Sequence, residues 1–161
     1  MTLQKLKLNL ISVAILVALF SAAQAQSAQA AVMTPGQHIF AHQLAAKTHL
    51  DGAVVKAWVL AETSGSAARH REALHNHNWL NWGYFDSSKT PTNAVWRSPK
   101  NSANAIAKTI MYRSQFRGIR NSAGKNRETQ IRAIVKSRWA ASGYDNGKIL
   151  RALIKRYFKK G

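Results

Sequence analysis

The chain has 161 residues, with 24 lysines and arginines against six aspartates and glutamates, and it has no cysteine. The lack of cysteine excludes disulfide bonds and thiol chemistry, so the fold must be held together by packing alone. The formal net charge of +18 favours a polyanionic partner such as an acidic wall polymer, anionic lipid or nucleic acid, but carries no information about catalysis.

The N-terminal segment is typical of a secretory signal peptide. Lys5 and Lys7 precede an apolar run of eleven residues, 10–20, and small residues follow that run. The run is too short to cross about 30 Å of hydrocarbon as a membrane anchor. Ala25 and Ala30 each complete a small-x-small cleavage pattern, so the cut can follow either residue.

Cleavage would leave residues 31–161, which is enough chain for one domain with one core. Removal of two signal lysines takes the formal charge from +18 to +16. We therefore expect residues 1–30 to be a signal and leader, and the mature protein to be a periplasmic or secreted monomer without a transmembrane anchor. Export makes anionic polymers of the cell envelope the expected partners, and no nucleic acid is expected.

Two helices are predicted first. The sequence 34–37, Thr-Pro-Gly-Gln, has the N-cap, first-turn proline and N3 glutamine of a capping box. Asp51 is predicted to cap the second helix, and Gly65 to end it. The expected inward residues are Ile39, Phe40, Leu44, Val54, Val55, Trp58 and Val59.

Residues 64–99 lack a sustained helical period and are rich in Asn and aromatic residues, which predicts a long structured loop or a very small sheet. Three more helices follow. The third is expected after Pro99 with Asn101 or Ser102 as its cap, and a loop over 115–126 leads to the fourth. A turn at 142–147 precedes the last. The expected inward residues are Ala103, Ile106, Ala107, Ile110, Met111, Ile131, Ile134, Val135, Trp139, Ile149, Leu150, Leu153, Ile154, Tyr157 and Phe158.

Glu62 differs from the other acids because Trp58 and Val54 precede it at intervals of four, which extends the apolar stripe to its side chain. Burial and the negative end of the helix dipole both raise the pKa of a carboxyl group. An acid kept protonated in this way can act as a general acid, as in glycosidases. The alternative is an ion pair with a base such as Arg69.

Other kinds of site have weaker support in the sequence. His38 and His42 are one helical turn apart, but no further ligands are evident, so no metal and no cofactor are expected. No phosphate-binding glycine loop or esterase motif is present. The aromatic and amide side chains of 76–88, NHNWLNWGYFDSS, can stack on sugar rings and bond their substituents, or they can pack under the loop.

Four segments, AVVKAWVLAETSGS, NHNWLNWGYFDSS, WRSPKNSANAIAKTI and IRAIVKSRWAASGYDNGKI, resemble the lysozyme-like superfamily in their order. The resemblance is closest to glucosaminidase-type peptidoglycan hydrolases of bacteria and phages. It implies a mainly α fold with two lobes around a cleft and a small loop or β insertion after the second helix. It also implies hydrolysis of β-1,4 glycosidic bonds in peptidoglycan, on the N-acetylglucosamine side.

The same resemblance implies roles for individual residues. Glu62 would be the general acid and Asp86 the second carboxylate. The residues expected to bind the glycan are Asn78, Asn81, Trp82, Tyr84, Trp139 and Tyr144. The chain departs from the pattern in the Thr-Ser-Gly that follows Glu62 and in the lack of a clear motif around a second acid. These departures leave a lytic transglycosylase, or a cationic wall-binding or antimicrobial protein without enzymatic activity, as alternatives.

Overall fold

The computed structural model describes residues 33–63, 75–82, 95–137, 139 and 143–158, and these residues are mainly helical. Over these ranges there is no strand. The helices are α2 (Pro35–Thr48), α3 (Gly52–Thr63), α5 (Pro99–Tyr112), the 3₁₀ helix η1 (Ser114–Phe116), α6 (Arg117–Ser122), α7 (Arg127–Lys136), α8 (Gly143–Asn146) and α9 (Lys148–Tyr157). The predicted signal and leader, residues 1–30, lie outside the described residues, as does Gly65.

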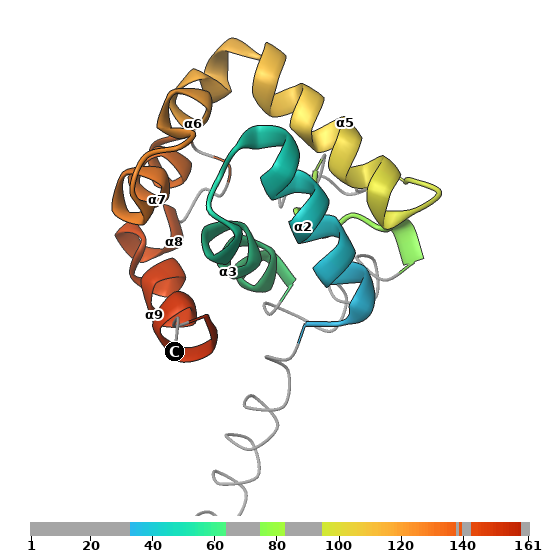
Figure 1. Ribbon diagram of the computed structural model, residues 1–161, viewed down its shortest axis with the longest axis horizontal. Coiled ribbons are helices and arrows are strands. Elements are labelled where there is room, and N and C mark those ends of the chain that lie inside the picture. Colours follow the sequence, from blue (N-terminus) through green and yellow to red (C-terminus); the bar gives the residue numbers. More distant parts are fainter. Residues whose placement is uncertain (1–32, 64–74, 83–94, 138, 140–142, 159–161) are drawn as a thin grey trace, which may run out of the picture. The chain divides into compact units, whose positions relative to one another are not determined.

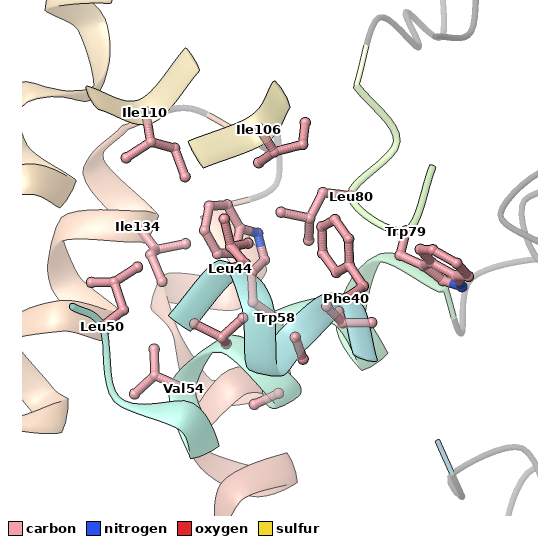
Figure 2. Packing of buried hydrophobic residues seen from close by; sticks show 14 of the residues in the cluster. Phe40, Leu44, Leu50, Val54, Trp58, Trp79, Leu80, Ile106, Ile110 and Ile134 are labelled. Carbon is pink, nitrogen blue, oxygen red and sulfur yellow. The ribbon is translucent and has the colours of Figure 1, made fainter. Parts of the chain in front are cut away.

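Helix α3 lies at the centre of the helical unit, with α2, α7 and α9 packed against it and α5 packed on α2 (Figure 1). Most residues of α3 are buried, which agrees with its near-continuous apolar sequence. Side chains from several helices meet in one core, where Trp58 lies among Leu44, Leu80, Ile106 and Ile134 (Figure 2). The core thereby fixes the direction of α3, whose last turn carries Glu62.

Both predicted caps of the first two helices are confirmed. Thr34 and Gln37 form a capping box, with Pro35 in the first turn of α2. The carboxylate of Asp51 accepts hydrogen bonds from the backbone N–H groups of Ala53 (2.8 Å) and Val54 (3.3 Å) at the start of α3. These polar groups satisfy N–H donors that a helix leaves unpaired in its first turn.

The start of α5 and the loop after it differ from the prediction. Ser98, rather than Asn101 or Ser102, is the N-cap, because Pro99 occupies the first helical turn, where its missing N–H costs nothing. The segment 115–126 is not a plain loop, since η1 and α6 occupy most of it. Phe116 and Ile119 hold these short helices by burying their side chains in the core.

Three residues predicted to point inward are exposed instead, namely Ile39, Met111 and Ile149. In α2 the buried face is formed by Gln37, Phe40, Ala41, Leu44 and Thr48, and Ile39 is on the opposite side of the helix. In α9 only Leu150 is fully buried. In the part of the chain that the structure describes, no helix has the length and apolar character needed to cross a membrane.

Candidate active site

Glu62 lies in the last turn of α3 with only 8% of its surface exposed. The next residue, Thr63, ties this turn to α2. Its hydroxyl donates to the carbonyl of Val59 (2.9 Å) and accepts from Nε2 of Gln37 (3.0 Å). Because both side chains of that interhelical bond are buried, the end of α3 is fixed in place with its carboxylate.

The two oxygens of the Glu62 carboxylate have different partners. The hydroxyl of Tyr144 donates to Oε1. The side-chain amide of Asn81 donates to Oε2 (3.1 Å) and to the backbone carbonyl of Glu62 (2.9 Å). Since a carbonyl can only accept, the amide orientation of Asn81 is fixed by this second bond. The site thus joins three segments that are far apart in the sequence.

Tyr144 lies between Glu62 and the core. Its hydroxyl accepts a hydrogen bond from Nε1 of Trp58 (2.8 Å), and the residue is 4% exposed. Burial, together with the neighbouring Glu62 carboxylate, raises the pKa of the Tyr144 hydroxyl far above its usual range. The hydroxyl therefore stays protonated and serves as a hydrogen-bond donor to Glu62.

Tyr144 is carried by a rare left-handed turn. Residues 143–147 all have positive φ, at 57°, 53°, 50°, 52° and 83° in order. The turn is closed by the N–H of Gly147, which bonds the carbonyls of Gly143 (3.2 Å) and Tyr144 (3.0 Å). A left-handed conformation costs about 1–2 kcal/mol per residue for residues other than glycine. Strain of this kind gathers at functional sites, where the surrounding structure maintains it.

The backbone of Asn81 is also left-handed, with φ of 50°. Asn tolerates this conformation better than most residues do. Asn78 closes the same turn. Its side-chain carbonyl accepts from the N–H of Trp82 (2.8 Å), and its amide donates to the carbonyl of Trp82 (2.9 Å). Asn78 is 2% exposed. Asn78 was expected to contact substrate, and in the structure its amide group is buried and bonds the backbone of the loop.

An aromatic cluster lies next to these hydrogen bonds. Trp139 contacts Trp58, Trp82 and Phe116, with ring centroids 5.0, 5.2 and 5.1 Å apart. Its indole N–H donates to the carbonyl of Leu80 (2.9 Å). Trp82 and Trp139 are partly exposed, and the guanidinium of Arg113 lies over the Trp82 ring at 5.1 Å. Through Trp139, the cluster joins the turn of Asn81 to the segment that follows α7.

The structure brings together Glu62, Asn81, Trp82, Trp139 and Tyr144 from the predicted site. Tyr84 and Asp86 lie outside the described residues, as does Arg69, the alternative partner of Glu62. Sequence reasoning missed the polar role of Trp58, which was assigned to the core alone. Trp58 lies one helical turn before Glu62, and this spacing could have indicated that its indole N–H is close to the site. Phe116 and Arg113 had no signal, because they follow a helix that was predicted to end in a loop.

Over the described ranges, no three His, Asp or Glu side chains gather into a possible metal site. His38 and His42 lie exposed on α2.

Comparisons with models of known families, with curated proteins and with solved structures found no match. Any assignment of function therefore depends on the geometry around Glu62 and on the sequence motifs that supply it.

Proposed function

We propose that the protein is an exported peptidoglycan hydrolase with a lysozyme-like, two-lobed fold. It would cleave β-1,4 glycosidic bonds of the glycan strand, in the manner of an N-acetylglucosaminidase, with Glu62 as general acid. The observation that carries this proposal is the buried carboxylate at the end of α3, held by Tyr144 and Asn81. A carboxyl group with this combination of burial and fixed orientation suits proton donation to a leaving glycosidic oxygen.

The hydrogen bonds assign different tasks to the two carboxyl oxygens. Tyr144 donates to Oε1 whether Glu62 is ionised or neutral, so Oε2 is the oxygen that would carry the transferred proton. Asn81 bonds both Oε2 and the backbone carbonyl of Glu62, and it would keep Oε2 directed to the substrate side. Tyr144 and Asn81 are thus proposed to position the acid, with Asn81 also within reach of the sugar.

The second carboxylate in this proposal is Asp86. It would stay ionised and either stabilise the oxocarbenium-like centre or activate a water. A separation of about 5–5.5 Å between the two carboxyl groups would indicate retention of configuration, and about 6.5–9.5 Å inversion. If no second carboxylate takes part, the same general acid suits a lytic transglycosylase, in which the substrate's own hydroxyl group attacks.

Sugar contacts would come from the partly exposed rings. Trp82 and Trp139 lie against each other with their ring planes tilted by 40°, and both still retain exposed surface, so the apolar face of a sugar can pack on them. Tyr84 is proposed to extend this surface. Asn78 is proposed to serve the glycan site by holding the backbone of Trp82 in this loop.

Mass spectrometry of the products released from purified murein tests this function. Hydrolysis adds water and creates a reducing end, with N-acetylglucosamine at that end for the proposed specificity. A transglycosylase releases anhydro products that are lighter by one water. Intact murein after prolonged incubation would contradict both forms of the proposal.

A second candidate is a cationic wall-binding protein without enzymatic activity. The observation that favours it is the distribution of charge. Of the described acids, Asp51, Glu128 and Asp145 each form an ion pair with a base. Other exposed lysines and arginines face solvent without an ion-pair partner among the described residues, including Lys155 and Arg156 on α9. Such a surface attracts polyanions regardless of any active site.

A further inference from the structure

A pocket of about 400 Å³ lies between α6 and α7, which pack side by side (Figure 1). None of its lining residues takes part in the hydrogen bonds at Glu62. Its lining residues are Gln115, Gly118, Thr129, Arg132, Ala133, Lys136 and Ser137. Its volume is within the range of small-ligand sites, about 300–1,000 Å³.

The polar side chains of this pocket match an anionic group. Arg132 and Lys136 are one turn apart on α7, so both cationic groups can reach the same ligand. A guanidinium offers a planar fork of donors and an ammonium a compact charge, and the two together suit carboxylate or phosphate. Thr129 and Ser137 add hydroxyl groups, while Gly118 and Ala133 leave room between the helices.

Among the described residues, the acid that bonds a lining side chain of the pocket is Glu128, and it does not cancel the charge of the pocket. Glu128 accepts from Nε of Arg132 (3.2 Å), but both of its oxygens also bond the guanidinium of Arg151, at 2.6 and 2.9 Å. One negative charge is therefore shared between two arginines. The segment 113–137 contains seven basic residues and one acidic residue, and of the seven Arg127 is paired with Asp51. Arg132 and Lys136 thus leave the lining of the pocket with a net positive charge.

The pocket is adjacent to the aromatic cluster of the candidate site. Ser137 lines the pocket, and its hydroxyl accepts from the N–H of Trp139 (3.3 Å). Gln115 also lines it, and the next residue, Phe116, contacts the Trp139 ring. A long polymer could therefore occupy the pocket and the aromatic surface at the same time.

We propose that the α6–α7 pocket binds a carboxylate or phosphate group of an anionic polymer. The sources that fit are an acidic peptide attached to a glycan strand and a phosphodiester chain. This inference rests on the proposed function only for the choice of probes, because binding in the pocket requires no catalysis by Glu62.

Amide chemical shifts of the ¹⁵N-labelled full-length protein test the proposal. The probes are an N-acetylated acidic tetrapeptide, an oligo(glycerol phosphate) and a neutral N-acetylglucosamine oligomer. We expect at least one anionic probe to shift the amide signals of Gly118, Thr129 and Ser137. The probe with the lower dissociation constant identifies which of the two sources the pocket prefers. The neutral sugar should leave these three amides unchanged. No shift with either anion, or equal shifts with the neutral sugar, would overturn the proposal.

Matched variants separate the pocket from general charge attraction. The double variant Arg132→Gln/Lys136→Gln should raise the dissociation constant at least about tenfold, since it removes two charge-assisted interactions. Lys155→Gln/Arg156→Gln on α9 removes the same charge and should have a much smaller effect. Equal losses in the two variants would contradict a specific site.

A third variant, Gly118→Leu, narrows the pocket without changing its charge. Nothing lies within 4 Å of a Cβ built at Gly118, so the variant can fold, and it should weaken anion binding. Unchanged binding would contradict the pocket location. Glu62→Gln should bind the anion as the parent does. Loss of catalysis and loss of pocket binding therefore remain separate outcomes.

Discussion

Tyr144 joins the core to the carboxylate of Glu62, because its hydroxyl accepts from Trp58 and donates to Glu62. Removal of this hydroxyl by Tyr144→Phe would leave the buried indole N–H of Trp58 without its acceptor. Such a loss costs about 1–3 kcal/mol. We expect the free energy of unfolding in urea to fall by this amount near neutral pH. Tyr112→Phe is the matched control, since Tyr112 is 84% exposed and its loss should change little.

The raised pKa of Tyr144 makes this contribution depend on pH. Above about pH 10 an unfolded tyrosine loses its proton while the folded residue keeps it, so unfolding is favoured as the pH rises. The stability difference between the parent and Tyr144→Phe should therefore narrow between about pH 8 and pH 11. A constant difference across this range would show that Tyr144 is not buried beside Glu62.

The residues of the candidate site were predictable to different degrees. Glu62 could be singled out from its place on an apolar helix face. Its contact with Tyr144 could not be derived from spacing, because the two residues are 82 positions apart and the strained turn at Tyr144 gives no periodic signal. Asn78 was predicted as a sugar ligand because an amide in a polar loop has the right chemistry. Its burial depends on how the loop closes, which composition does not show.

At the scale of single elements, the cap of α3 is also its link to α7. Asp51 caps α3 and accepts from Nε of Arg127 (2.9 Å). Burial alone would raise the pKa of Asp51, but the hydrogen bonds from Arg127 and from the helix N–H groups outweigh burial and lower it. Asp51→Asn keeps a capping acceptor and loses the ion pair, whereas Asp51→Ala loses both. We expect the alanine variant to be destabilised by about 1 kcal/mol more than the asparagine variant.

The stabilisation from the Asp51 carboxylate should depend on acid pH. A carboxyl whose pKa is lowered by folding stabilises the protein above its unfolded pKa, about 3.9. That stabilisation is lost as the pH falls through the lower, folded value. Thermal unfolding of the parent and of Asp51→Asn should therefore converge in strong acid. A difference that persists there would contradict the ion pair as its cause.

A substitution at Gly147 tests the left-handed turn that carries Tyr144. Its φ is 83°, and a Cβ at this position would lie 2.8 Å from Cγ2 of Ile131. Gly147→Ala combines a left-handed backbone with a steric clash and should cost about 2–4 kcal/mol in urea unfolding. Gly52→Ala is the control, because nothing lies within 4 Å of a Cβ there and the variant should be neutral or slightly stabilising. Equal effects of the two variants would contradict the turn geometry.

Helices were predictable where local signals begin them. The capping box at Thr34 and the aspartate cap at Asp51 are short patterns with a direct physical cause, and both are present. Helix α6 was missed because it is six residues long and contains Gly118. Isolated helices of that length are unstable. Its stability comes from burial of Ile119 and the preceding Phe116, which requires the rest of the fold.

At the scale of the whole molecule, high net charge and the candidate active site make different predictions for wall binding. Charge attraction weakens as salt rises because exposed charges are screened within about 8 Å at physiological ionic strength. Stacking of sugars on Trp82 and Trp139 would not weaken in the same way. We expect the amount of Glu62→Gln bound to purified murein to fall in high salt, as charge attraction is screened. The fraction bound by sugar stacking should remain bound. Complete loss in salt would favour the non-enzymatic cationic binder.

The most direct measurement of the central proposal is the rate at which purified murein is solubilised by the parent and by Glu62→Gln. The glutamine keeps the size of the side chain and can still accept from Tyr144, but it has no proton to donate. We predict a rate lower by at least about 100-fold. Glu128→Gln changes a partly exposed, ion-paired glutamate on α7; it is the matched control and should retain the parent's rate. If Glu62→Gln solubilises murein as fast as the parent does, Glu62 is not the general acid and the proposed enzymatic function is wrong.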